Sequence, residues 1–187
     1  MSDSPTEDFE HAEHAEHAAH EGNRFMTLVS VTIAVLAMVA ATVGSLEAIE
    51  TAATIDAKSE AVFFQNKATD NWNFFQAKSL KKNMYDIAAA QGGANVADFQ
   101  TQAKKNEDDS AEIMQEARKL EGETDAKLRE SDSHQRRHQV LTIAVTLLHV
   151  SIAIATISII TRGQRWPWLG SLILGAAGMI AAGAAYL

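Results

Sequence analysis

The sequence predicts an all-α integral membrane protein with three transmembrane helices and a long antiparallel helical hairpin between the first and the second. One observation is a gap in proline, because no proline lies between Pro5 and Pro167. The strongest break inside that gap is the pair Gly92 and Gly93. Proline costs about 3 kcal/mol inside a helix and paired glycines favour a turn, so we expect two long helices, at residues 24–91 and 94–161.

Three segments without a charged residue are long enough to cross a bilayer. They occupy residues 25–46, 140–161 and 166–187. A helix needs roughly 20 apolar residues to cross the hydrocarbon core, and helices of soluble proteins rarely stay uncharged for that length. We therefore expect transmembrane helices at 24–46, 140–161 and 167–187, with a tight turn at 162–166 and Pro167 in the first turn of the last helix.

The polar residues 47–139 are predicted to form the hairpin, with its tip at Gly92 and Gly93, so that the numbers of facing residues sum to about 185. Each arm carries a stripe of mostly small residues at spacings of three and four, which is typical of the seam of a coiled coil. The stripes are Ala53, Ala57, Ala61, Phe64, Ala68, Trp72 and Phe75, and then Phe99, Ala103, Ser110, Ile113, Ala117, Leu120, Thr124 and Leu128. A seam so poor in Leu and Ile predicts a hairpin that is marginally stable alone.

Two kinds of residue predict self-association into a homo-oligomer. Phe63 and Phe74 point away from the seam, which favours packing between subunits, although an arm that folds back would also cover them. Small residues at helical spacing let helix backbones approach closely in lipid, either within one chain or between chains. These small residues are Ala37, Ala41 and Gly44 in the first span and Ser171, Gly175, Gly178 and Ala182 in the third.

The second predicted span carries a polar stripe at helical spacing. The stripe consists of Thr142, Thr146, His149 and Thr156. An ionisable group inside a membrane span indicates an ion path or a proton relay by default. Because the span holds no Asp, Glu, Lys or Arg to complete a relay, we favour a neutral histidine that is hydrogen-bonded to another helix.

Aromatic and basic residues mark the expected membrane boundaries. Trp166 and Trp168 fit one interface and Tyr186 fits the opposite one. Arg136 and Arg137 precede the second span, flanked by two histidines four residues apart, His134 and His138. We expect this basic group to contact lipid headgroups. The positive charges on the two sides are too evenly balanced to decide which side holds the hairpin.

Residues 1–23 form an acidic, histidine-rich tail that contains the repeat EHAEHAEHAAHE. Its histidines are His11, His14, His17 and His20. Imidazole and carboxylate groups suit zinc, nickel or copper, and histidine titrates near neutrality, so one hypothesis is a metal-loading or pH-sensing tail. The spacing matches no defined zinc motif, and we favour a solvated helix of low complexity without a bound metal.

The remaining sequence argues against several classes of function. The chain has no cysteine, and we find no nucleophile with an adjacent base, no Rossmann fingerprint and no phosphate-binding loop. It also lacks the basic patch that nucleic acid requires. We therefore expect no enzymatic activity, no cofactor and no nucleic-acid partner. The expected function is a membrane scaffold that self-assembles; the alternatives are a channel, transport or sensory component that uses the polar stripe or the hairpin tip, and a metal-handling tail.

Four stretches of the chain resemble a known family. They are EGNRF before the first span, GSLEAIETAATIDAKSEAV after it, the aromatic run NKATDNWNFFQAKSLKKNMY, and SHQRRHQ before the second span. This pattern resembles a bacterial membrane-protein family known as domain of unknown function 4337, over nearly the whole chain. The resemblance implies a small multi-pass protein of the bacterial inner membrane, of unassigned activity, and it brings no catalytic residues.

Overall fold

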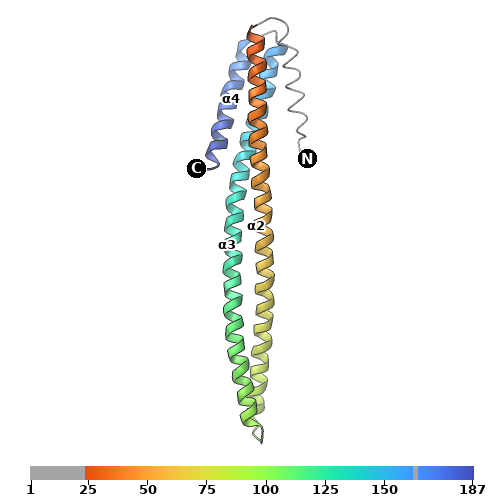
Figure 1. The fold of residues 1–187 in the computed structure, drawn as a ribbon, viewed down its shortest axis with the longest axis vertical. Helices are drawn as coiled ribbons and strands as arrows, with labels where there is room; N and C mark the ends of the chain where they lie inside the picture. The colour runs from red at the N-terminus through yellow and green to blue at the C-terminus, as the bar shows by residue number, and fades with distance from the viewer. Residues whose placement is uncertain (1–23, 162–163) are drawn as a thin grey trace. The chain divides into compact units, whose positions relative to one another are not determined.

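The computed structural model describes residues 24–161 and 164–187, which contain three α-helices and no strand. Helix α2 spans Arg24–Ala90, α3 spans Val96–Ile160 and α4 spans Arg165–Ala184 (Figure 1). The predicted all-α fold is confirmed, and α2 and α3 begin and end within two residues of the expected limits. All three helices are long and apolar enough to cross a membrane. Helix α4 begins earlier than predicted, at Arg165 inside the expected turn.

Two glycines reverse the chain between α2 and α3. The φ angle is 78° at Gly92 and 112° at Gly93, a region that side-chain-bearing residues rarely adopt. The Gly92 N–H donates to the carbonyl oxygen of Ala89 at 3.2 Å and closes the end of α2. The chain thus reverses at the two glycines where the sequence predicts the tip of the hairpin, and this turn depends on the absence of a Cβ atom.

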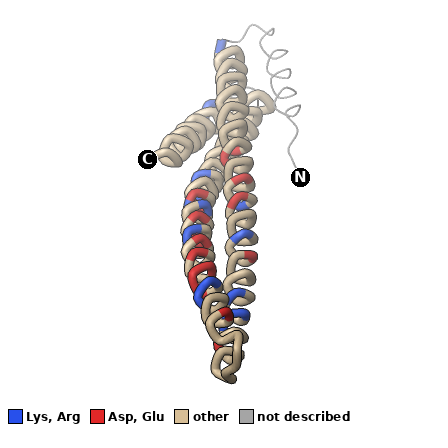
Figure 2. The backbone as a smooth tube through the Cα atoms, turned by 60° about the horizontal axis from the view of Figure 1, so that its bottom comes forward, with Lys and Arg blue, Asp and Glu red and all other residues tan. Residues whose placement is uncertain are grey.

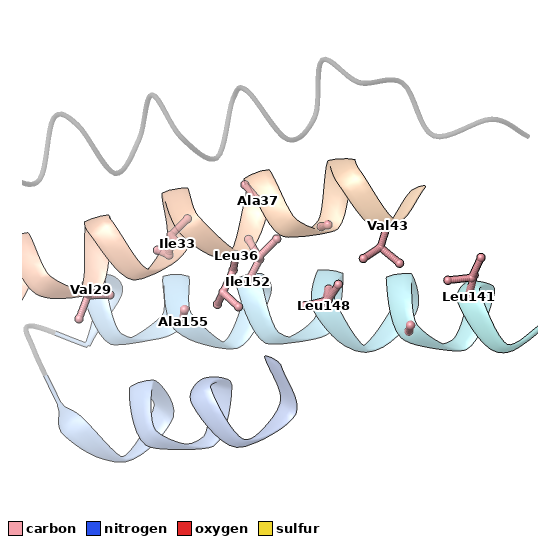
Figure 3. Close-up of a cluster of buried hydrophobic side chains, with 11 residues drawn as sticks. Val29, Ile33, Leu36, Ala37, Val43, Leu141, Leu148, Ile152 and Ala155 are labelled. Carbon is pink, nitrogen blue, oxygen red and sulfur yellow. The ribbon is translucent and has the colours of Figure 1, made fainter. Parts of the chain in front are cut away.

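The described chain divides into two compact units, each treated separately below. The arm unit is Thr54–Asp132, and the apolar unit combines the residues up to Ala53 with Ser133–Leu187. In the arm unit, charged residues occur along both helices (Figure 2). In the apolar unit, two strips of apolar side chains from α2 and α3 face each other (Figure 3).

The arm unit is held by a seam of small side chains between antiparallel α2 and α3. Ser131 donates a hydrogen bond to the Thr54 carbonyl at 3.3 Å, and Lys127 Nζ lies 2.7 Å from Glu60 Oε2, which matches the predicted register. The buried residues are Ala57, Ala61, Ala68, Ala103, Asn106, Ser110, Ala117, Leu120, Thr124 and Ser131. Most of the predicted seam is thus buried.

The prediction that Leu128 belongs to the seam was wrong. The side chain of Leu128 is 45% exposed, whereas Thr124 and Ser131 on either side are buried. The residues of α3 that face α2 here are Thr124, Lys127 and Ser131. Leu128 therefore faces away from α2. Lys127 takes the inner position because its ammonium group bridges Glu60 and Glu130, at 2.7 and 2.9 Å.

The core of the apolar unit lies between the first part of α2 and the last part of α3 (Figure 3). Its buried members are Val29, Ile33, Leu36, Ala37, Ala40 and Val43 of α2 and Leu141, Ala144, Leu148, Ile152 and Ala155 of α3. Helix α4 contacts both helices through glycine. A Cβ atom on Gly175 would come within 2.7 Å of Leu36 Cδ2, and one on Gly178 within 3.1 Å of the Ala144 carbonyl oxygen.

The outer faces of the apolar unit are as apolar as its core. Met38 is 63% exposed, Ile143 58%, Ile173 72% and Ile180 73%. Large apolar side chains exposed over three neighbouring helices form a surface that water does not favour, and such surfaces mark membrane or protein contacts.

We expect Gly93→Ala to destabilise the fold by about 1–3 kcal/mol, because alanine is strained at the positive φ of the turn. Gly122→Ala is the matched control, since Gly122 lies inside α3 with no atom within 4 Å of an added Cβ. The control should be neutral or stabilising by up to about 1 kcal/mol. Thermal unfolding followed by circular dichroism would measure both. Equal effects of the two substitutions would contradict this account of the turn.

We expect Gly178→Ala to loosen the packing of α4, with a cost of about 1–3 kcal/mol from overpacking. The added methyl group would meet the Ala144 carbonyl oxygen and Leu148 Cγ at 3.0–3.1 Å, and the backbone atom cannot move aside. Gly170→Ala is the control on the same helix, because nothing lies within 4 Å of its Cβ position. The midpoint of thermal unfolding in detergent should fall for the first variant only.

Candidate functional site

A polar cluster in the apolar unit joins α2, α3 and the turn that follows α4. We call it the Glu50 cluster. Its members are Glu47, Glu50 and Thr51 of α2, His134, Arg137, His138 and Thr142 of α3, and Tyr186. They occupy the segments where the uncharged stretches of α2 and α3 give way to charged sequence.

Glu50 is the centre of the cluster and is only 5% exposed. His134 Nδ1 lies 2.5 Å from Glu50 Oε2, and Arg137 Nη1 lies 3.9 Å from Oε1. The hydroxyl group of Tyr186 also forms a hydrogen bond with Glu50. Tyr186 is fixed a second time, because the Arg137 guanidinium lies 5.5 Å from the centre of its ring. A buried carboxylate is costly unless it is paired, and Glu50 has partners from two other segments of the chain.

A second layer of the cluster surrounds Glu47. Its Oε1 atom lies 2.5 Å from Thr142 Oγ1 and 3.7 Å from His138 Nδ1. His138 Nδ1 also lies 3.0 Å from Thr51 Oγ1, and that hydroxyl group donates to the Glu47 carbonyl oxygen at 2.9 Å. Both histidines of the α3 segment therefore face glutamates of α2.

The hydrogen bonds define which ring nitrogen of each histidine carries a proton. A hydroxyl group has one proton, and because Thr51 donates its proton to a carbonyl oxygen, it accepts from His138 Nδ1. An ionised Glu50 only accepts, so His134 Nδ1 is likewise the donor.

The cluster differs from a metal centre. Among the residues that the structure describes, no group of three or more His, Asp or Glu side chains could hold a metal ion. The four histidines of the tail, His11, His14, His17 and His20, lie outside the described residues.

The polar stripe of the second predicted span does not converge on a common site. Thr146 Oγ1 donates to the Thr142 carbonyl at 2.8 Å, and Thr156 Oγ1 donates to the Ile152 carbonyl at 3.0 Å. These hydroxyl groups are satisfied by their own helix, and His149 is half-buried. Of the stripe, Thr142 is the member that belongs to the Glu50 cluster.

The two aromatic residues predicted to pack between subunits are exposed in the arm unit. Phe63 is 53% exposed and Phe74 is 60% exposed. Phe63 contacts Phe64 edge-to-face at 5.6 Å, and Lys67 Nζ lies 4.6 Å from its ring centre. Since most of both rings faces solvent, the alternative of an arm that folds back to cover them is not what the structure shows.

The small residues of the predicted spans are used mainly within one chain. Ala37 belongs to the core, and Ser171, Gly175 and Gly178 are buried. Gly44 and Ala182 are half-buried, and Ala41 is exposed. The sequence left open whether this packing is internal or between chains; for the buried positions, the contact surface is occupied by the chain's own helices.

A groove near the tip of the arm unit is open to solvent and has a volume of about 590 Å³. Its walls include Tyr85 and Phe99, whose rings stack at 6.3 Å, and Lys78, whose Nζ lies 2.6 Å from Asp109 Oδ2. The hydrogen bond from Lys78 holds the pKa of Asp109 below its usual value. The basic side chains Lys81 and Lys105 complete this part of the wall.

Sequence reasoning missed the glutamates of the Glu50 cluster. It assigned the basic group before the second span to lipid headgroups, whereas His134, Arg137 and His138 contact Glu47 and Glu50. The signal was present in the register, because facing residue numbers that sum to about 185 place Glu50 opposite His134. Tyr186 could not be found in this way, since α4 lies outside the hairpin.

Over residues 24–161 and 164–187, these features define three helices long and apolar enough to cross a membrane, two of which continue into a charged helical arm. The model of the family described as domain of unknown function DUF4337 matches residues 25–187. The chain therefore belongs to this family. Comparison with curated proteins and with solved structures found no match.

We expect His134→Ala to destabilise the apolar unit by about 1–3 kcal/mol, because Glu50 loses its nearest donor while it stays buried. His134→Gln is the control, since its amide group offers a neutral donor of similar reach and should recover much of the loss. Thermal unfolding at neutral pH would measure both variants. If the alanine and glutamine variants both unfold like the wild type, the Glu50–His134 contact does not stabilise the fold.

Proposed function

We propose that this protein is a non-enzymatic, multi-pass protein of the bacterial inner membrane that assembles into a homo-oligomer and acts as a scaffold or membrane-organising element. Membrane insertion is supported by three membrane-length helices with apolar outer faces. The two ends of α4 add support. Trp168 lies near Phe25 and donates to Thr32 Oγ1 at 3.2 Å, whereas Tyr186 lies at Arg137 beyond the other end. Aromatic residues at both ends of a span are typical of membrane interfaces.

The observation that carries the proposal of self-assembly is the exposure of Phe63 and Phe74 in the arm unit. Their separation is close to three turns of an α-helix, so both rings lie on one face of α2. A second face of α2 exposes Val62, Leu80 and Met84, each at least 60% accessible. A helix pair flanked by charged residues gains little from leaving such side chains in water, and burial between copies would remove them from it.

A sensory role is the second candidate, and the Glu50 cluster is the observation that favours it. The cluster groups titratable side chains from separate helices around a buried carboxylate. The polar stripe gives weaker support for a channel, because Thr146 and Thr156 bond their own backbone. A metal-handling role for the tail rests on its four histidines alone.

We expect Phe74→Glu to break the assembly, because a carboxylate cannot be buried unpaired in an aromatic contact between subunits. The mass of the particle in nanodiscs, measured by native mass spectrometry, should fall from that of an oligomer to that of one chain. Asn73→Glu is the matched control, since it adds the same charge at an exposed neighbouring position and should leave the mass unchanged. A Phe74→Glu variant that keeps the wild-type mass, or a wild type that is itself monomeric, would refute the proposal.

A further inference from the structure

We propose that the arms of neighbouring copies meet through α2 of one copy and α3 of the next, with Phe63 and Phe74 seated against Gly122 and Ala111. This inference rests on the homo-oligomer proposed above, and it names the surface that receives the exposed aromatic rings. The partner is a second copy of this chain. Each arm supplies both halves of the contact, one on each of its helices, so the contact is heterologous.

The two aromatic residues and the two small residues have the same spacing. Phe63 and Phe74 lie eleven residues apart on α2, and Ala111 and Gly122 lie eleven residues apart on α3. Eleven residues are close to three turns of an α-helix, so each pair shares one face of its helix. Both rings are more than half exposed, and Ala111 and Gly122 are also exposed. Each arm thus carries two protruding rings on one helix and two positions with little or no side chain on the other.

The two pairs also lie at the same levels of the arm. The register of the seam, in which facing residue numbers sum to about 185, places Phe63 level with Gly122 and Phe74 level with Ala111. Copies that enter one membrane in the same direction begin their arms at the same level. Each ring of one copy is therefore level with a small residue on α3 of its neighbour.

Gly122 lies inside α3 at a position where its own chain gives no reason for a glycine. Among the described residues, nothing lies within 4 Å of an added Cβ atom, and φ is not in the left-handed region. Glycine inside a helix is less favourable than alanine, and the usual reason to keep it there is packing or function. A ring from a neighbouring copy can approach the α3 backbone most closely at this position.

Burial of the rings favours α3 as the surface that receives them. Contact with Gly122 and Ala111 removes Phe63 and Phe74 from water while the two helices stay close. A contact between two α2 arms would place each ring against the same ring of the other copy, because identical residues lie at the same level. That arrangement would hold the helix backbones apart.

The charges of the two arms also favour contact between unlike helices. Within the arm unit, α2 carries five lysines and four acidic residues, whereas α3 carries eleven acidic residues and six basic ones (Figure 2). The net charge is therefore +1 on α2 and −5 on α3. Juxtaposed like charges disfavour association, so two α3 arms repel each other and α3 is better placed beside α2.

Cross-linking between single cysteines tests this contact, because the chain has no cysteine of its own. Asp70 lies between the two rings on α2, and Gln115 lies between the two small residues on α3, at the same level. Both are exposed. Asp70→Cys and Gln115→Cys, carried by two differently tagged chains, would be co-expressed and oxidised in the membrane. A mixed dimer should form, since a disulfide requires Cα atoms within about 7 Å.

Ala97→Cys is the matched control for position, because Ala97 is exposed and lies eighteen residues from Gln115, five full turns away on the same face of α3. Its cross-link to position 70 should be about ten-fold weaker or less, because the two positions lie at different levels. Gly122→Leu should weaken the cross-link between positions 70 and 115 by a similar factor, since it fills the place of the ring. Ala97→Leu adds a larger side chain outside the contact and should leave that cross-link unchanged.

The mass of the unoxidised particle in nanodiscs separates two kinds of failure. A monomeric particle would overturn the proposed assembly and this contact with it. An oligomer that cross-links mainly between two copies of position 70 or two copies of position 115 would overturn this contact alone. So would an oligomer in which position 97 cross-links as strongly as position 115, or in which Gly122→Leu has no effect.

Discussion

Close approach of helix backbones through small side chains is the constraint on which this structure depends. In the arm unit, alanine fills five of the ten buried positions between α2 and α3, and serine fills two more. In the apolar unit, Gly175 and Gly178 of α4 bring that helix so close that an added Cβ atom would crowd Leu36 and the Ala144 carbonyl oxygen. Helices that meet through alanine and serine bury little side-chain area, so the large side chains of the arm unit lie mostly outside its seam. The exposed Phe63 and Phe74 side chains are therefore a consequence of how the two arms pack.

The same constraint explains why Glu50 is buried. The seam continues past the last uncharged residues of α2 and α3, and a side chain that faces the partner helix at this spacing has no path to water. Glu50 occupies such a position and is 5% exposed. Its charge is tolerated because the facing positions of α3 supply a histidine and an arginine. The Glu50 cluster thus occupies the part of the interface between α2 and α3 where the apolar sequence ends.

The sequence was sufficient to predict the helices, the turn and much of the seam, because these depend on local signals. The absence of proline and the pair Gly92 and Gly93 act along the chain, and the alanine stripes repeat at helical spacing. The misplaced Leu128 shows the limit, since hydrophobicity favoured it while a bridge from Lys127 to Glu60 decided the inner position. The contact made by Tyr186 could not be predicted from the sequence, for another reason. Its contact with Glu50 depends on where α4 packs, and no repeat in the sequence encodes that.

A seam rich in alanine does not by itself select one register of the two helices, and the polar contacts supply that selection. Because small residues recur along the seam at helical spacing, a slide of α3 along α2 by one turn would cost less in packing than in a seam of large interlocking side chains. Polar pairs do not tolerate such a slide: Lys78 with Asp109 and Lys127 with Glu60 fix the arm unit, and Glu50 with His134 fixes the apolar unit. A buried ion pair is often no more stabilising than an apolar pair of the same size, and the best-attested reason to keep one is that it selects a single register. At Glu50 the register is selected by a histidine, because His134 of α3 lies 2.5 Å from this buried carboxylate of α2.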